Sequence, residues 1–176
     1  MKRWLAAGAL LLAAACRTAT PVAGMPRNFG VVEEGAIYRG AQPTSSEMES
    51  LQRRGVRTIV KLNTQELDRE RADAARLGIQ LIYLPLNARL VGTPGSCAEV
   101  ERAYEAMTRR ENQPVYVHCS HGRDRTGFLI GLWRERQQHW PYEKVKSELA
   151  LYGHGAAMHA VLPNIENGLA RGVCGR

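Results

Sequence analysis

The sequence predicts a single α/β domain with a mainly parallel central sheet flanked by helices. Short apolar, β-branched runs alternate with amphipathic stretches of ten or more residues, the pattern of strands joined by covering helices. About 150 residues follow an apolar N-terminal segment, which suits one domain. There are no internal repeats or low-complexity tracts. In such a sheet, we expect ligands at the carboxyl ends of the strands.

The first half of the domain contains clear start and stop signals. Thr44-Ser45-Ser46-Glu47 is a capping box, and Gly78 follows an amphipathic stretch as a helix-ending glycine does. The expected elements are strands at Val31–Val32 and Ile37–Tyr38, a helix from Thr44 to about Arg54, a strand at Arg57–Leu62, a helix at Glu66–Leu77 and a strand at Ile79–Leu84.

The second half begins with another capping-box pattern, Ser96-Cys97-Ala98-Glu99, and Pro141 marks a later helix start. The expected elements are a helix from Ser96 to about Arg110, a strand at Pro114–Val117, a helix opening at Gly127–Trp133, a helix from Pro141 to Leu151 and a helical segment at Ala157–Leu169 interrupted by Pro163. Strands thus alternate with helices along the chain.

The segment His118–Gly127 joins the fifth strand to an apolar helix. Five residues separate Cys119 from Arg125, enough for the backbone to curl so that successive N–H groups point inward beside a helix N-terminus. Arg125 could hold two phosphate oxygens, and the same positive surroundings would lower the pKa of the thiol from about 8.5 to about 3.5–7.5. Thr126 is placed to donate its hydroxyl to the thiolate, and Gly122 can adopt positive φ. We expect a phosphate-binding loop with a nucleophile.

This segment resembles the C-x5-R-[ST] signature loop of the cysteine-dependent protein tyrosine and dual-specificity phosphatase superfamily. The stretches Ile37–Pro43 and Gly55–Asn63 are similar to those of small bacterial, plant and fungal atypical dual-specificity phosphatases, so the resemblance spans Phe29 to Leu169. It implies a tyrosine/dual-specificity phosphatase-like fold and hydrolysis of phosphate monoesters through a phosphocysteine, without a cofactor or metal.

The resemblance also assigns roles within the loop. It implies that Cys119 is the nucleophile and that Arg125 binds phosphate. The expected substrate-binding residues are Ser120, His121, Gly122, Arg123 and Thr126, with His118 and Gly127 as structural support.

The general acid departs from the family pattern. Classical members carry an Asp about thirty residues before the Cys, but the corresponding segment Pro85–Gly95 has no Asp or Glu. Asp124 is the first candidate, because myotubularin-type loops carry an acid there; the alternative is a carboxylate that pairs with an Arg and holds the loop. Asp68 and Glu66 are second candidates, and the alternative for both is a solvated helix start.

Substrate stays open between phosphotyrosine or phosphoserine proteins and inositol phosphates or phosphoinositides. The Asp-Arg-Thr end of the loop also resembles lipid phosphatases, and the basic residues His121 and Arg123 slightly favour polyphosphorylated ligands. Two alternatives differ in kind: a phosphate-binding pseudophosphatase, motivated by the missing acid, and a rhodanese-like sulfurtransferase.

Charge and composition restrict the partners. The chain carries 24 Lys and Arg against 17 Asp and Glu, a formal net charge of +7, which suits acidic substrates. No nucleic-acid-binding motif or aromatic-interleaved basic stripe is present, so nucleic acid is not an expected partner. The sequence does not predict an oligomeric state.

The N-terminus predicts export. Lys2 and Arg3 precede a short apolar run that ends at Cys16, typical of a secretory signal rather than a membrane span. Residues 1–15 would be the signal peptide, 16–28 a tether, 29–170 the phosphatase domain and 171–176 a tail. Cys16 resembles a lipobox cysteine, with ordinary signal cleavage as the alternative. We therefore expect a periplasmic or cell-envelope protein, held at the membrane by a lipid on Cys16.

The remaining cysteines and histidines have less specific signals. Cys97 and Cys174 could form a disulfide in an exported protein, or remain two free thiols. His139, His154 and His159 lack the spacing of a metal site, so no metal site is expected.

Overall fold

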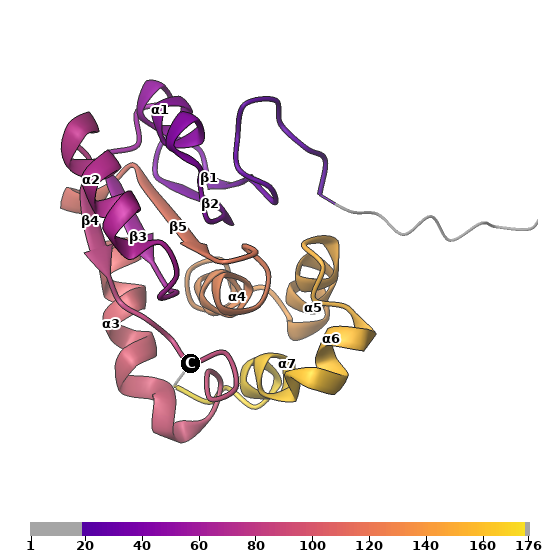
Figure 1. Cartoon of the computed structure of the whole chain (residues 1–176). Helices are drawn as coiled ribbons and strands as arrows, with labels where there is room; N and C mark the ends of the chain where they lie inside the picture. Colours follow the sequence, from indigo (N-terminus) through magenta and orange to yellow (C-terminus); the bar gives the residue numbers. More distant parts are fainter. Residues whose placement is uncertain (1–18, 175–176) are drawn as a thin grey trace, which may run out of the picture.

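The computed structural model describes residues 19–174 (Figure 1). The predicted signal peptide, residues 1–15, and the predicted lipidation site Cys16 lie outside these residues. The strands are β1 (Gly30–Glu33), β2 (Ile37–Ala41), β3 (Thr58–Lys61), β4 (Gln80–Tyr83) and β5 (Val115–Cys119). The helices are α1 (Ser45–Arg53), α2 (Leu67–Leu77), α3 (Cys97–Thr108), α4 (Asp124–Gln138), α5 (Tyr142–Leu151), α6 (Ala156–Val161) and α7 (Pro163–Ala170). No helix among residues 19–174 is long and apolar enough to cross a bilayer.

The five strands form one sheet in the order β1-β2-β5-β3-β4. Only the β1–β2 pair is antiparallel, which confirms the prediction of a mainly parallel sheet. The central strand, β5, is buried along its whole length. Its last residue, Cys119, pairs with Ala41 of β2, and His118 pairs with Lys61 of β3. The carboxyl ends of three parallel strands therefore meet at Cys119, the predicted nucleophile.

Helices cover both faces of the sheet, as predicted (Figure 1). Helices α1 and α2 bury Met48, Leu51 and Ala74 against one face. On the other face, α3, α4, α5 and α7 share a larger core, with α4 in the middle of the group. Because α4 is enclosed by its neighbours, every residue from Thr126 to Arg134 is buried. The helix that begins at the predicted phosphate-binding loop is thus rigidly held.

The two predicted capping boxes have different outcomes. Thr44 caps α1 and forms the reciprocal bonds with Glu47, as predicted. Ser96 does not cap α3: its hydroxyl donates to the carbonyl of Thr93 at 2.9 Å, inside a 3-10 turn at Pro94–Ser96. Pro94 starts this turn ahead of the helix, so the Ser96 side chain faces backwards along the chain and not toward the N–H of Glu99.

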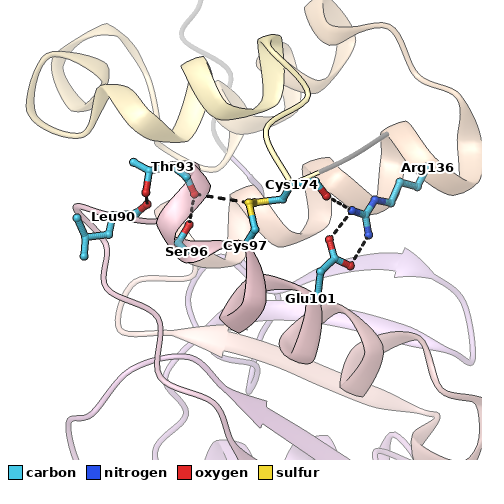
Figure 2. The surroundings of a disulfide bond; sticks show 7 residues. All are labelled: Leu90, Thr93, Ser96, Cys97, Glu101, Arg136 and Cys174. Atoms are coloured by element: carbon cyan, nitrogen blue, oxygen red, sulfur yellow. Dashed lines mark hydrogen bonds and ion pairs between the residues drawn. A yellow bond between two sulfur atoms is a disulfide. The ribbon is translucent and has the colours of Figure 1, made fainter.

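A disulfide joins Cys97, the first residue of α3, to Cys174 near the C-terminus (Figure 2). The two Cα atoms are 4.9 Å apart. Arg136 of α4 donates to the carboxylate of Glu101 and to the backbone carbonyl of Cys174, as Figure 2 shows. The tail is therefore tied to both α3 and α4.

Residues just before Phe29, which the sequence assigns to the tether, contact the domain. Met25 packs beside the core under α1, and the carbonyl of Arg27 accepts a hydrogen bond from Ala41 N–H at 2.8 Å. The packed part of the chain therefore begins before Phe29, and it brings Arg27 and Asn28 to the end of β2.

Candidate active site

Residues from the N-terminal part of the domain hold the loop between β5 and α4 through hydrogen bonds and close packing. Gly122 has φ of +65°, and a Cβ atom there would lie 2.2 Å from the backbone carbon of Gly40, so a side chain does not fit. The buried Arg39 guanidinium donates to the carbonyl of Gly122 at 2.7 Å, and Asn28 Nδ2 donates to that of His121 at 2.9 Å. These bonds occupy the carbonyls of His121 and Gly122, while the N–H groups of His121 and Thr126 interact with the Cys119 sulfur.

Cys119 is 2% exposed and is the one free cysteine among the described residues. Burial alone raises the pKa of its thiol, but hydrogen bonds from the hydroxyl and N–H of Thr126, the charge of Arg125 and the N–H of His121 outweigh it, and the pKa lies below its ordinary value. The Thr126 side chain is fully buried, and its hydroxyl is the largest of the contributions that lower the pKa of Cys119. The loop therefore favours the thiolate, which is the nucleophilic form.

Arg125 is fixed by backbone carbonyls of the segments that follow two other strands. Its Nη1 donates to the carbonyl of Leu62 after β3 at 3.2 Å and to that of Leu86 after β4 at 3.3 Å. Nη2 contacts Ser120 Oγ at 3.4 Å, whereas the buried Nε has no partner in the described part of the chain. A buried N–H without a partner is costly, and a phosphate oxygen in the loop would satisfy it.

A chain of amides and hydroxyls forms one edge of the loop. Ser120 Oγ donates to Gln65 Oε1 at 3.0 Å, and Asn63 Nδ2 donates both to Gln65 Oε1 at 2.9 Å and to Gln42 Oε1 at 2.6 Å. Gln42, Asn63 and Gln65 were not among the predicted site residues. Their place in the chain could have indicated them, because Gln42 and Asn63 come just after strands that end beside Cys119, where ligands bind in parallel sheets.

A basic cavity of about 150 Å³ adjoins the loop. Its lining comprises Arg27, Asn28, His121, Arg123, Leu151, Tyr152 and Gly153. Burial and the charges of Arg27 and Arg123 lower the pKa of His121, which keeps the imidazole neutral over a wider pH range. The structure thus brings the predicted residues His121 and Arg123 together with Arg27, which lies 94 residues before His121 and was not predicted because no local pattern connects it to the loop.

Asp124 is occupied by two partners. Arg123 Nε lies 3.1 Å from both carboxylate oxygens, and His154 Nδ1 donates to Oδ1 at 2.7 Å. Burial raises the pKa of Asp124, but the His154 hydrogen bond and the Arg123 charge outweigh it, so the net pKa lies below its ordinary value. An ionised carboxylate with these partners positions the loop more readily than it delivers a proton. This arrangement favours the loop-holding alternative over the predicted role as general acid.

Asp68 and Glu66 lie at the start of α2 and are solvated, with side chains 99% and 61% exposed. Each faces an arginine of its own helix, Arg71 and Arg69. Within residues 19–174, neither carboxylate has a hydrogen bond or ion pair with the loop. This is the geometry of acids at a helix N-terminus, and the two residues stay a prediction as proton donors.

A fully buried group of three charged or polar side chains supports the loop from the α2 side. Glu70 of α2 contacts Lys61 Nζ through one oxygen and His118 Nε2 through the other, the latter at 2.9 Å. His118 Nδ1 in turn faces the carbonyl of Cys119 at 3.3 Å. Burial raises the pKa of Glu70, but His118 and Lys61 outweigh it and the net shift is downward. His118 therefore lies where a supporting residue is expected, and Glu70 holds it there.

Known proteins are similar to this chain in both sequence and fold. Residues 20–159 match a family described as "DSP-PTPase phosphatase fused to NAD+ Kinase". The dual specificity protein phosphatase TpbA of Pseudomonas aeruginosa is 30% identical over 120 residues, which cover 68% of this chain and 52% of TpbA. The inositol diphosphatase SIW14 of Saccharomyces cerevisiae is 30% identical over 128 residues, which cover 70% of this chain and 44% of SIW14. The chain thus spans about half the length of these relatives.

Solved structures extend the likeness in three dimensions. The core catalytic domain of the PP-IP phosphatase SIW14 superposes with a TM-score of 0.68 at 25% identity, over 82% of this chain and 85% of that domain. P. aeruginosa TpbA superposes with a TM-score of 0.65 at 22% identity, over 92% of this chain and 98% of the TpbA chain, a likeness of fold.

Proposed function

The chain belongs to the DSP-PTPase family of atypical cysteine-dependent dual-specificity phosphatases, and from this premise we propose that it hydrolyses phosphorylated substrates through a phosphocysteine on Cys119. One observation carries the proposal: a single loop holds a buried thiol of lowered pKa and the fixed guanidinium of Arg125, whose Nε is unpaired in the described part of the chain. A nucleophile and an oxyanion ligand in one loop are the two components that phosphoryl transfer to sulfur requires.

The reaction has two displacements. In the first, Cys119 Sγ attacks phosphorus, the bond to the leaving oxygen breaks, and that oxygen departs with the electron pair. In the second, water attacks the phosphocysteine, the P–S bond breaks, inorganic phosphate leaves with a proton lost to solvent, and the thiolate returns. Arg125 holds two phosphate oxygens in both steps, and Thr126 stabilises the thiolate as it leaves.

The absence of Asp and Glu from segment 85–95 indicates which leaving groups the site can expel. A carboxylic acid must protonate an alkoxide as it departs, and a phenolate with pKa of about 10 also benefits from one. A phosphate leaving group, with a second pKa of about 6, departs without a proton. Because segment 85–95 lacks Asp and Glu and Asp124 is held ionised, the site favours cleavage of a phosphate from a diphosphate.

The basic cavity supports the same class of substrate. A ligand with several phosphates could place one in the loop and a second beside Arg27 and Arg123. We therefore propose a polyphosphorylated small molecule, such as an inositol diphosphate, as the preferred substrate. The similarity to SIW14, named as an inositol diphosphatase, supports this choice.

We also propose that residues 1–15 direct export and that Cys16 carries a lipid anchor in the cell envelope. The disulfide between Cys97 and Cys174 supports an oxidising compartment, where such bonds persist. Globomycin-sensitive processing of the full chain, abolished by Cys16→Ala, would test the lipidation.

The function is tested by phosphate release from three substrates in the presence of a chelator. The substrates are an inositol diphosphate, a phosphotyrosine peptide and a phosphoserine peptide, given to the full chain and to Cys119→Ser and Arg125→Lys. We expect kcat/KM to decrease in that order of substrates. Cys119→Ser should release no phosphate. Arg125→Lys should lose most of kcat/KM, because lysine keeps the charge but not the bidentate geometry. Release that persists in Cys119→Ser would refute the phosphocysteine. Binding without release by the intact chain would favour the pseudophosphatase, and preference for the phosphotyrosine peptide would refute the proposed substrate class.

A further inference from the structure

Three side chains with metal-binding atoms converge behind the active-site loop. His154 lies in the turn between α5 and α6, His159 lies in α6 and Glu166 lies in α7. One ligand atom from each of the three side chains lies within 4.8 Å of the other two. Glu166 Oε1 is 3.9 Å from His154 Nε2 and 3.6 Å from His159 Nδ1.

The hydrogen bonding of this cluster is incomplete. Both distances to Glu166 exceed the length of a hydrogen bond. His154 Nε2 and His159 Nδ1 are buried atoms without a hydrogen-bond partner in the described chain, and His154 as a whole is 1% exposed. Buried polar atoms in native proteins are almost always paired, so two converging unpaired nitrogens point to a ligand between them.

The spacing suits a small tetrahedral ion. Zinc binds His nitrogen at about 2.0–2.1 Å and carboxylate oxygen at about 2.0–2.2 Å, which places neighbouring ligand atoms about 3.3–3.5 Å apart. The two distances to Glu166 need to shorten by a few tenths of an ångström to reach this geometry, and the two histidines, whose ligand atoms lie within 4.8 Å of each other, by up to about 1.4 Å. Imidazole nitrogens favour zinc over magnesium or calcium, which prefer oxygen ligands.

The outer contacts orient the ligands as they do in known metal sites. His154 Nδ1 must donate to the Asp124 carboxylate, so the lone pair of Nε2 is directed into the cluster. The second oxygen of Glu166 accepts from Tyr142 OH at 3.2 Å and faces Lys146 Nζ at 3.5 Å. The Lys146 side chain is half exposed and can turn to solvent when a cation binds.

We propose that His154, His159 and Glu166 bind a divalent transition-metal ion, with Zn²⁺ as the best fit and water as the fourth ligand. The ion would pin α6 and α7 together and, through the His154–Asp124 hydrogen bond, hold the start of α4. It takes no part in phosphoryl transfer. The sequence predicts no metal site here, because these ligands lie on three separate segments without a recognised spacing.

Zinc titration of the full chain carrying Cys119→Ser tests the proposal, since the catalytic thiolate could itself bind zinc. After treatment with a chelator, Zn²⁺ is titrated against a chromophoric competitor. We expect one tight site per chain, weakened at least about ten-fold by His159→Ala or Glu166→Gln. His139→Asn is the matched control: His139 is an exposed histidine with φ of +53°, a conformation that Asn tolerates, and its loss should leave the affinity unchanged.

Two further readouts identify the ligands. X-ray absorption of the zinc-bound protein should show nitrogen and oxygen neighbours without sulfur, and zinc should raise Tm in the Cys119→Ser parent but not after His159→Ala. Equal affinity in the parent and both ligand variants, sulfur in the coordination shell, or a site weakened equally by His139→Asn would each overturn the proposal. Absence of a tight site in the parent would overturn it as well.

Discussion

At the scale of single residues, the thiol of Cys119 is subject to two opposing effects. Burial disfavours the thiolate, whereas the Thr126 hydrogen bonds and the Arg125 charge favour it and prevail. The thiolate thus depends on a few donors held at fixed positions. Removing one donor should change its ionisation without removing the sulfur.

Replacement of Thr126 by Val should raise the pKa of Cys119, because the fully buried hydroxyl donates to the sulfur. The rate of Cys119 alkylation by iodoacetamide, which follows the thiolate fraction, should then rise at a higher pH than in the parent. We also expect kcat to fall about 10²-fold, since the leaving thiolate loses a donor. Thr126→Ser keeps the hydroxyl and serves as the control. Superimposable alkylation curves for Thr126→Val and the parent would contradict this assignment.

Replacement of Asp124 by Asn separates the two roles considered for this residue. If Asp124 positions the loop through Arg123 and His154, kcat/KM should fall by a similar factor, about 10–100-fold, for an inositol diphosphate and for a phosphoserine peptide. A general acid would show the opposite pattern, with a loss confined to the phosphoserine peptide, whose alkoxide needs a proton. The ratio of kcat/KM between variant and parent, measured for each of the two substrates, distinguishes a positioning residue from a general acid.

At the scale of secondary-structure elements, buried charge links α2 to β3 and to β5, the strand that ends at Cys119. Lys61, Glu70 and His118 are all fully buried, and Glu70 contacts both of the others. Such a group stabilises a fold only while it is complete, because each member left alone is an uncompensated polar group in the interior.

Removal of the Glu70 charge should therefore destabilise the protein strongly. We expect Glu70→Gln to lower the free energy of unfolding by about 3–5 kcal/mol, since Lys61 is left buried and unpaired. The double variant Lys61→Met/Glu70→Gln should recover part of this loss. Urea unfolding measures both, with the exposed Glu99→Gln as the control for loss of an acidic charge. A loss in Glu70→Gln as small as in Glu99→Gln would show that the group contributes little.

The same group predicts a pH dependence. The pKa of Glu70 is lower in the folded protein than its unfolded value of about 4.3, so the ionised carboxylate stabilises the fold above that pH. This contribution is lost as the pH falls through the folded pKa. In acid titrations followed by urea unfolding, Glu70→Gln should show a weaker decline of stability below about pH 4 than the parent. Parallel declines would contradict the prediction.

Short sequence motifs predicted helix ends correctly where the structure of the helix end depends only on the residues of the motif. The Thr44 capping box and the Gly78 helix end are local features, and both are present. Ser96 has the same pattern as Thr44, but the preceding Pro94 diverts the backbone into a 3-10 turn. A four-residue motif could not reveal that competition.

At the scale of the whole molecule, the site divides into a contiguous part and a dispersed part. The segment His118–Gly127 contains the proposed nucleophile Cys119 together with Arg125 and Thr126, so one motif predicted all three. Arg27, Gln65 and Glu70 come from other segments and meet the loop only through the strand order and the covering helices. No sequence spacing indicates that these three residues lie beside the loop.

The disulfide should contribute to global stability. It connects residues separated by 77 positions, and such a long closed loop restricts the unfolded chain. We expect Cys97→Ser/Cys174→Ser to lower the free energy of unfolding by about 2–4 kcal/mol and dithiothreitol to lower the Tm of the parent but not of the variant. Equal sensitivity of both proteins to dithiothreitol would contradict this expectation.

The central claim is that Cys119 carries the phosphate during turnover. The most direct test is rapid acid quenching of the full chain during hydrolysis of an inositol diphosphate, followed by mass spectrometry of the peptide that contains residues 118–127. The account predicts a phosphate on Cys119 that appears within the first turnover and is absent from Cys119→Ser. Steady phosphate release with no modified Cys119, or with phosphate on another residue, would contradict it.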